Sequence, residues 1–324
     1  MPVAAPPSQA PSTNYWGPIT SNIDFCEANY ELSPYIAEYW NCLSNSGYVA
    51  LAMYGIYTTR RFQLEFRFIF CYLTVLCIGF GSGAFHATLR STEQMYDEFP
   101  MMYCLSSMLY ALYANNSPKG KVHYNVIAGL FMMTSVVMYF YLMLDSAVMF
   151  QVCFGIILTA FVISAYVRNV TIKIPEPSAS SSSSSAAAAN GNISNEKVPR
   201  KRFEDTARKA LKAAFWTGLG AYLLGYILWV IDMNHCDLLV QLRALVGKPW
   251  DVVFQNHLWW HIFTGIGSHN AIVTLQYMRS VTLYGAASPF EIKWFAGIII
   301  YLSKRSPFSD DDDNTDEFCF NKLK

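Results

Sequence analysis

Charged residues are scarce in this chain. Only 14% of its 324 residues are Asp, Glu, Lys or Arg, whereas 53% are hydrophobic; soluble domains carry about 25% charged residues. The two signs balance at 23 residues each, so no net basic charge favours a nucleic-acid partner. The cysteines also lack zinc-finger spacing. These shortages argue against a soluble domain or a nucleic-acid-binding protein and favour a chain that crosses a membrane several times.

The N-terminal stretch MPVAAPPSQAPSTNYWGPIT has neither the positive n-region nor the apolar h-region of a secretory signal peptide. Membrane insertion is therefore expected to begin with the first spanning helix.

Apolar segments long enough to cross a bilayer recur along the chain. A helical span needs about 20 residues. Seven windows meet this length, at 36–57, 67–89, 98–115, 124–143, 147–167, 213–231 and 256–278. The sequence thus predicts an all-α membrane protein with a seven-helix transmembrane bundle.

The regions outside these windows divide the chain further. Residues 1–35 form an N-terminal segment, 36–280 the transmembrane domain, and 281–324 a C-terminal segment with an acidic tail. A serine-rich stretch at about 174–199 interrupts the domain, and we expect it to be a disordered loop because it has few apolar side chains to bury.

Lys and Arg accumulate in the cytosolic loops of membrane proteins. Here they follow the first, third and fifth predicted helices and are densest between Arg168 and Lys212, whereas the segment before the first helix has none. This distribution predicts a luminal N-terminus and a cytosolic C-terminus.

Three histidines lie in apolar runs. His257 and His261 are four residues apart, so they share one helix face, and His86 lies in another apolar run, where an ionisable group suggests function. The predicted topology puts all three at a similar depth in the luminal half. Neutral imidazoles bind zinc, and a catalytic site needs three protein ligands. The alternative is that His257 and His261 hydrogen-bond to neighbouring helices.

Two further polar residues fall at the same depth. Ser82 precedes His86 by four residues and could donate a hydrogen bond beside a metal; alternatively it bonds back to the carbonyl of Ile78. Asp97 could take a proton from water and pass it to a leaving amine. Its alternative role is the N-cap of the third predicted helix.

Acidic residues cluster before and at the start of the first predicted helix. Asp24, Glu27 and Glu38, with Asn29, offer the oxygen atoms that calcium prefers. The spacing is not that of an EF-hand, and a solvated acidic turn explains the residues as well.

Eight cysteines are present, and five of them lie inside predicted helices, where they behave as small apolar groups. Cys319 belongs to the cytosolic tail, which leaves Cys26 and Cys236 on the luminal side, where disulfides are permitted. We predict a bridge between these two.

Several separated motifs carry a family resemblance. The stretches IDFCEANYELSPYIAEYWNCLSN, GSGAFHATLRSTEQMYDEFPMMY, WVIDMNHC and HLWWHIFTGIGSHN resemble the alkaline ceramidases over nearly the whole chain, apart from the serine-rich loop and the acidic tail. The resemblance implies a seven-helix membrane amidase of the endoplasmic reticulum or Golgi. Such an enzyme splits ceramide or phytoceramide into a sphingoid base and a fatty acid, using an intramembrane zinc and a calcium near the N-terminus.

Carried over residue by residue, the resemblance implies three groups of site residues. These are zinc ligands His86, His257 and His261, with Ser82 and Asp97 beside the zinc-bound water; calcium ligands Asp24, Glu27, Asn29, Glu38 and the carbonyl of Phe25; and a disulfide of Cys26 with Cys236. The family often has Trp at the position of Phe25. Because a backbone oxygen is the implied ligand, this departure is expected to be harmless.

Two other functions remain open. The adiponectin and progestin receptor group also combines a Ser-x-x-x-His motif with two later histidines in seven helices, although the calcium-type N-terminus argues against it. A sensor with a structural zinc would have a closed site of four protein ligands. We expect a lipid substrate, no nucleic acid and no obligate protein partner.

Overall fold

The computed structural model describes residues 14–144, 146–175 and 194–305. The acidic tail and most of the serine-rich loop lie outside these residues. The helices are α1 (Tyr39–Ser44), α2 (Ser46–Arg61), α3 (Phe66–Thr88), α4 (Ser91–Tyr113), α5 (Tyr124–Leu144), α6 (Ala147–Thr171), α7 (Ser194–Asn234), α8 (Cys236–Val246) and α9 (Asn256–Tyr284). Short 3-10 turns are η1 (Ala114–Asn116), η3 (Trp250–Phe254) and η4 (Gly285–Ala287), and the strands are β1 (Phe290–Phe295) and β2 (Ile299–Lys304).

Each of the seven predicted windows contains a helix, but two begin earlier than predicted. The third begins at Ser91, not at 98, and encloses Pro100. The sixth begins at Ser194, not at 213, and so takes up residues of the predicted loop. A hydropathy window detects the apolar part of a helix and misses its polar extension.

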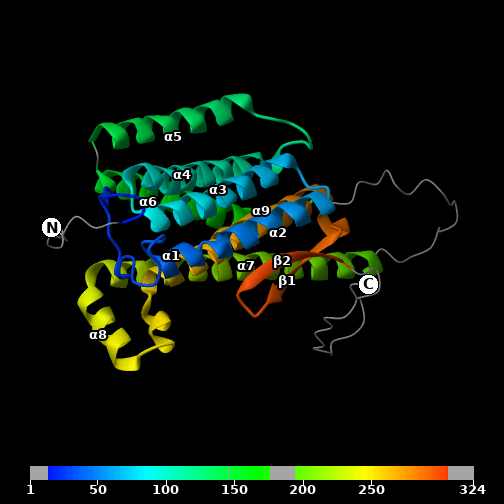
Figure 1. The fold of residues 1–324 in the computed structure, drawn as a ribbon. Helices are drawn as coiled ribbons and strands as arrows, with labels where there is room; N and C mark the ends of the chain where they lie inside the picture. Colours follow the sequence, from blue (N-terminus) through cyan, green and yellow to red (C-terminus); the bar gives the residue numbers. More distant parts are fainter. Residues whose placement is uncertain (1–13, 145, 176–193, 306–324) are drawn as a thin grey trace.

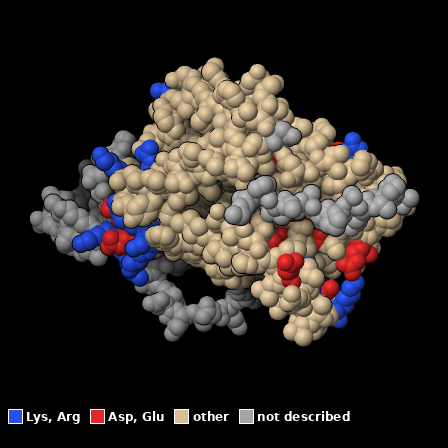
Figure 2. All heavy atoms as spheres, turned by 90° about the vertical axis from the view of Figure 1, so that its left-hand side faces the viewer, with Lys and Arg blue, Asp and Glu red and all other residues tan. Residues whose placement is uncertain are grey.

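The long helices run side by side along one direction (Figure 1). Of these, α3, α5, α6 and α7 are long and apolar enough to cross a membrane by length and composition. Figure 2 looks onto the end of the bundle at which α8 lies in Figure 1, and the few charged residues on this face lie mainly toward its edges. Along the sides of the bundle, α5 and α6 expose large apolar residues such as Phe131, Ile156 and Ile163, and this surface suits contact with lipid.

Helix α9 lies inside the bundle and packs against α7, α2, α3 and α4. Most of its residues are buried, including polar ones, whereas α5 at the outer edge is largely exposed. The central helix therefore carries the polar groups that lipid would not tolerate.

A glycine brings α3 and α4 together. A Cβ atom on Gly81 would lie 1.8 Å from the carbonyl oxygen of Tyr96, so only glycine permits this approach. Small residues allow such close packing between membrane helices. The contact places Asp97 of α4 next to Ser82 of α3.

A two-stranded hairpin after α9 departs from the all-α prediction. Strands β1 and β2 pair antiparallel, and their alternate apolar residues are buried. Asn270 accepts from the backbone N–H of Ile300 at 3.0 Å, and His269 Nε2 lies 3.1 Å from the Ile300 carbonyl. Part of the C-terminal segment is thus docked on the bundle.

Candidate metal centre

The three histidines of the predicted zinc site lie together. His86 comes from the last turn of α3, and His257 and His261 come from the first two turns of α9. Their ring centroids are 4.5 to 4.9 Å apart, and one ligand nitrogen from each lies within 4.8 Å of the others. All three side chains are buried.

Two of their nitrogens suggest a missing partner. Nε2 of His86 and Nδ1 of His257 are buried and make no hydrogen bond to any described residue. Leaving a buried polar atom unpaired costs about 1 to 3 kcal/mol, so such atoms call for an explanation. Three neutral imidazoles in one place are the ligand set of a catalytic zinc site, and the residues present therefore fit this ion.

Two contacts orient the rings. The Glu38 carboxylate lies 2.5 Å from Nδ1 of His86, and the Ser44 hydroxyl lies 2.7 Å from Nδ1 of His261. Ser44 donates its own proton to the carbonyl of Asn41 at 2.8 Å, so its oxygen is left to accept from His261. Both rings then carry a proton on Nδ1 and a lone pair on Nε2, the arrangement that partners around a metal ligand impose.

The sequence does not predict a role for Ser44. Its position near the start of the first predicted helix is the only signal in the sequence, and many serines in membrane helices have no functional role. Glu38 was expected only as a calcium ligand, and its contact with His86 depends on tertiary structure.

Ser82 and Asp97 lie beside the histidines. The Ser82 hydroxyl is 3.4 Å from Nε2 of His261 and is hydrogen-bonded to the carboxyl group of Asp97. Since α4 begins at Ser91, Asp97 is in its second turn and is not the helix N-cap. A hydroxyl donor and a carboxylate therefore stand on one side of the three imidazoles.

The expected calcium residues also gather around the start of α1. Asn29 donates to Asp24 at 3.3 Å, and the backbone N–H of Phe25 points to Glu38 at 3.4 Å. The side-chain amide oxygen of Asn29, Oδ1, is buried without a partner among the described residues. Carboxylate and amide oxygens grouped in this way fit a hard cation such as calcium.

Glu27 is held at the N-terminus of α1. Its two oxygens accept from the backbone N–H groups of Trp40 at 2.7 Å and Asn41 at 2.8 Å. Burial nevertheless raises the pKa of Glu27 to about 7 and raises the pKa of Asp24. A nearby cation would favour the ionised form of both groups.

The side chain of Phe25 has a contact that the sequence does not reveal. Its ring stacks on His257, with centroids 3.6 Å apart. Phe25 therefore contributes a ring that covers the metal centre, besides the backbone oxygen expected as a calcium ligand.

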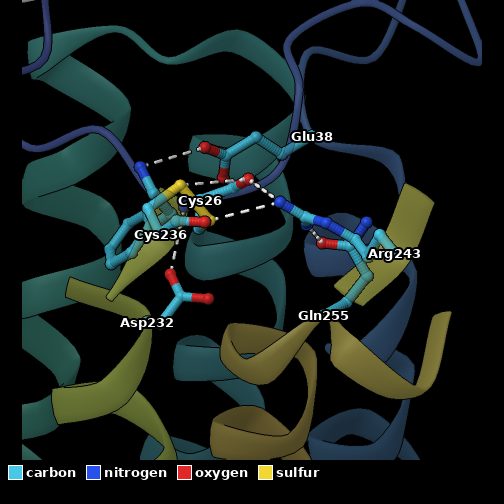
Figure 3. Close-up of a disulfide and its surroundings, with 7 residues drawn as sticks. Cys26, Glu38, Asp232, Cys236, Arg243 and Gln255 are labelled. Atoms are coloured by element: carbon cyan, nitrogen blue, oxygen red, sulfur yellow. Dashed lines mark hydrogen bonds between the residues drawn. A yellow bond between two sulfur atoms is a disulfide. The ribbon is translucent and has the colours of Figure 1, made fainter. Parts of the chain in front are cut away.

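A disulfide joins Cys26 to Cys236 (Figure 3). The backbone N–H of Cys26 donates to Asp232 at 3.0 Å, and Arg243 donates to the Cys26 carbonyl at 2.7 Å. The N-terminal segment is thus attached to the junction of α7 and α8. Asp232 belongs to the WVIDMNHC motif, but only the structure shows its partner.

An apolar cavity of about 280 Å³ lies between α4, α6, α7 and α9. Tyr48 and Trp260 line it near the histidines, and Met108, Phe161 and Met278 line it farther along the bundle. The Tyr48 ring centroid is 6.4 Å from that of His261, so the cavity begins next to the metal centre. Apolar walls with a few polar groups at one end are typical of a site for an apolar ligand.

Comparisons with known proteins agree with one another. The ceramidase family model matches residues 17–303. Alkaline ceramidase 3 of Mus musculus is 32% identical over 88% of this chain and 92% of its own length. An alkaline ceramidase of Saccharomyces cerevisiae is 30% identical over 86% and 82%, and one of Arabidopsis thaliana is 27% identical over 91% and 97%.

Proposed function

The chain belongs to the ceramidase family, and we propose that it is a zinc-dependent intramembrane amidase that hydrolyses ceramide or phytoceramide to a sphingoid base and a fatty acid. The observation that carries this proposal is the buried group of His86, His257 and His261, which has two unpaired nitrogens and adjoins an apolar cavity. The comparisons favour this function over the receptor-like alternative.

In this proposal the domain at 36–280 crosses the membrane seven times, with residues 1–35 in the lumen of the endoplasmic reticulum and the hairpin on the cytosolic side. The distribution of Lys and Arg supports this orientation. The disulfide supports it as well, since Cys26 and Cys236 then lie in an oxidising compartment. The metal centre then faces the luminal leaflet.

The residues around the histidines can divide the chemistry between them. When bound, zinc polarises an amide carbonyl and lowers the pKa of a coordinated water toward about 7. Ser82 turns its one hydroxyl proton from Asp97 to the carbonyl oxygen as negative charge develops there, and such a donor is worth roughly 10² to 10³ in turnover. Asp97 accepts a proton from the attacking water and delivers it to the leaving amine.

The lipid chains occupy apolar surfaces of the bundle. The cavity beside Tyr48 and Trp260 holds one alkyl chain and directs the amide group toward the histidines. Water is displaced from this part of the site, which strengthens the polar contacts at its luminal end.

A calcium ion bound by Asp24, Glu27, Asn29, Glu38 and the carbonyl of Phe25 stabilises the N-terminal segment in this proposal. Glu38 then contacts His86 as well, so the cation and the metal centre share one carboxylate.

The test is hydrolysis of ceramide, dihydroceramide and phytoceramide by purified protein, with bound zinc measured by mass spectrometry. His257→Ala should lose zinc and activity together, whereas Asp97→Asn should keep zinc and lose nearly all turnover. His269→Ala is the matched control. His269 is a buried histidine of the same helix, but it contacts the carbonyl of Ile300 in the hairpin and is not one of the three clustered histidines. Zinc should therefore stay bound in this variant. Full activity in zinc-free protein would refute the metal mechanism, and near-normal turnover in Asp97→Asn would refute the proton transfer.

A further inference from the structure

Helix α8 lies outside the bundle, beside the end of α7. A single residue, His235, separates it from α7. In Figure 1 α8 and η3 extend away from the bundle, on the side of α7 opposite to α3 and α4. In the proposed orientation this level is the luminal surface of the membrane, so the segment at 236–254 lies over lipid and not over the centre of the protein.

One side of α8 is anchored to the protein. Cys236 forms the disulfide with Cys26, and Arg243 reaches back to the Cys26 carbonyl and to Gln255 (Figure 3). Leu239, on the same side, is buried. These contacts fix the rotation of the helix about its axis.

The fixed rotation leaves a stripe of leucines without a partner. Leu238 is 52% exposed and Leu245 is 82% exposed, and Leu242 between them is partly exposed. Residues spaced four and then three apart form one face of a helix. The exposed Ala244 is not spaced three or four residues from any of these leucines, so it lies on a different side of α8. Trp250 in η3 adds a 69% exposed aromatic ring, and tryptophan is enriched at membrane interfaces.

The helix that precedes α8 also exposes apolar residues. Leu223, Leu224 and Ile227 of α7 are about half exposed, and α7 qualifies as a membrane span. An amphipathic helix that follows a span directly and is apolar on its free side is suited to lie in the plane of the interface.

We propose that the segment at 236–254 is an interfacial membrane anchor whose Leu238, Leu242, Leu245 and Trp250 insert into the luminal leaflet. The partner is a lipid surface. Because α9 begins at Asn256, the anchor also sets the depth of His257 relative to the leaflet that supplies the substrate. The proposal rests on the membrane orientation given above and is independent of the reaction chemistry.

The experiment places an environment-sensitive fluorophore on single cysteines of the full chain in phosphatidylcholine nanodiscs. The background protein has the exposed Cys77 and the C-terminal Cys319 replaced by serine. The same background without an added cysteine, treated with the fluorophore, corrects for labelling of the remaining thiols. Leu245→Cys reports on the leucine stripe. Ala244→Cys, exposed on a different side of α8, is the matched control. Ile156→Cys, 65% exposed on α6, reports a lipid-facing position. Lipids carrying a nitroxide at a shallow or a deep position serve as quenchers.

The label at 245 should be quenched at least threefold more by shallow nitroxide lipids than the label at 244, and the label at 156 should be quenched by deep nitroxides. Equal and weak quenching at 245 and 244, with strong quenching at 156, would overturn the anchor while leaving the membrane orientation intact. Protection of the label at 245 from both lipid and aqueous quenchers would overturn it in favour of a protein partner. Failure of the label at 156 to be quenched would overturn the spanning arrangement on which the anchor rests.

Discussion

Removal of the Ser44 hydroxyl tests how the metal centre is organised. In Ser44→Ala, Nδ1–H of His261 loses its acceptor at 2.7 Å, and an unpaired buried donor costs about 1 to 3 kcal/mol. Loss of a partner to a metal ligand typically lowers metal affinity about 10- to 100-fold. The two ranges agree, since tenfold corresponds to about 1.4 kcal/mol.

The structure favours the lower end of this range. The Asn45 amide lies 3.5 Å from the same Nδ1 atom, and its carbonyl oxygen has no partner among the described residues. A rotation of this amide would bring an acceptor toward His261. We therefore expect the zinc affinity of Ser44→Ala to be about tenfold lower than that of the parent. The double variant, Ser44→Ala with Asn45→Ala, should have a lower zinc affinity still.

The measurement is zinc occupancy of purified protein against graded zinc buffers, together with turnover at saturating zinc. Ser107→Ala is the control, because Ser107 is also buried and donates to the carbonyl three residues earlier but lies on α4. Ser44→Thr keeps the hydroxyl and should restore affinity. Parental zinc affinity and turnover in Ser44→Ala would refute the orienting role of this residue.

Three further predictions follow from other parts of the structure. Gly81→Ala would put a Cβ 1.8 Å from a carbonyl oxygen of α4, so we expect a loss of about 1 to 3 kcal/mol in unfolding free energy and lower turnover. In the control Gly83→Ala the new Cβ meets its nearest atom at 3.8 Å, so this variant should match the parent. Equal melting temperatures of Gly81→Ala and the parent would contradict this prediction. Burial raises the pKa of Glu27 from 4.5 to about 7, so between these values the calcium-free native state binds more protons than the unfolded state. The calcium-free protein should therefore lose stability as pH rises through 7, while its calcium affinity should rise. A calcium-induced shift in melting temperature that is independent of pH would count against this prediction. A peptide map of unreduced protein should show Cys26 joined to Cys236, and alkylation of both thiols in folded, unreduced protein would disprove the bridge.

Hydropathy and spacing predict much of this fold because both are local properties. Each of the seven apolar windows contains a helix, and the four-residue spacing of His257 and His261 places them on one face in the structure as well. The motifs identify the family, and the comparisons confirm the resemblance. These local signals do not predict the hairpin, because β1 and β2 are stabilised by packing against the distant helix α9.

The surroundings of the metal centre are decided by contacts between residues far apart in the sequence. Glu38 and His86 are separated by 48 residues, and Ser44 and His261 by 217. No periodicity records such pairs, since they depend on how the helices cross and where Gly81 lets α3 and α4 approach. The sequence by itself determined the long apolar helices, the family and the histidines, because these follow from local composition and motif, whereas the short α8 and the break between α1 and α2 lie outside that prediction. Only the tertiary structure decided which nitrogen of each ring is occupied, because that depends on which distant acceptor the packed helices bring within hydrogen-bonding distance.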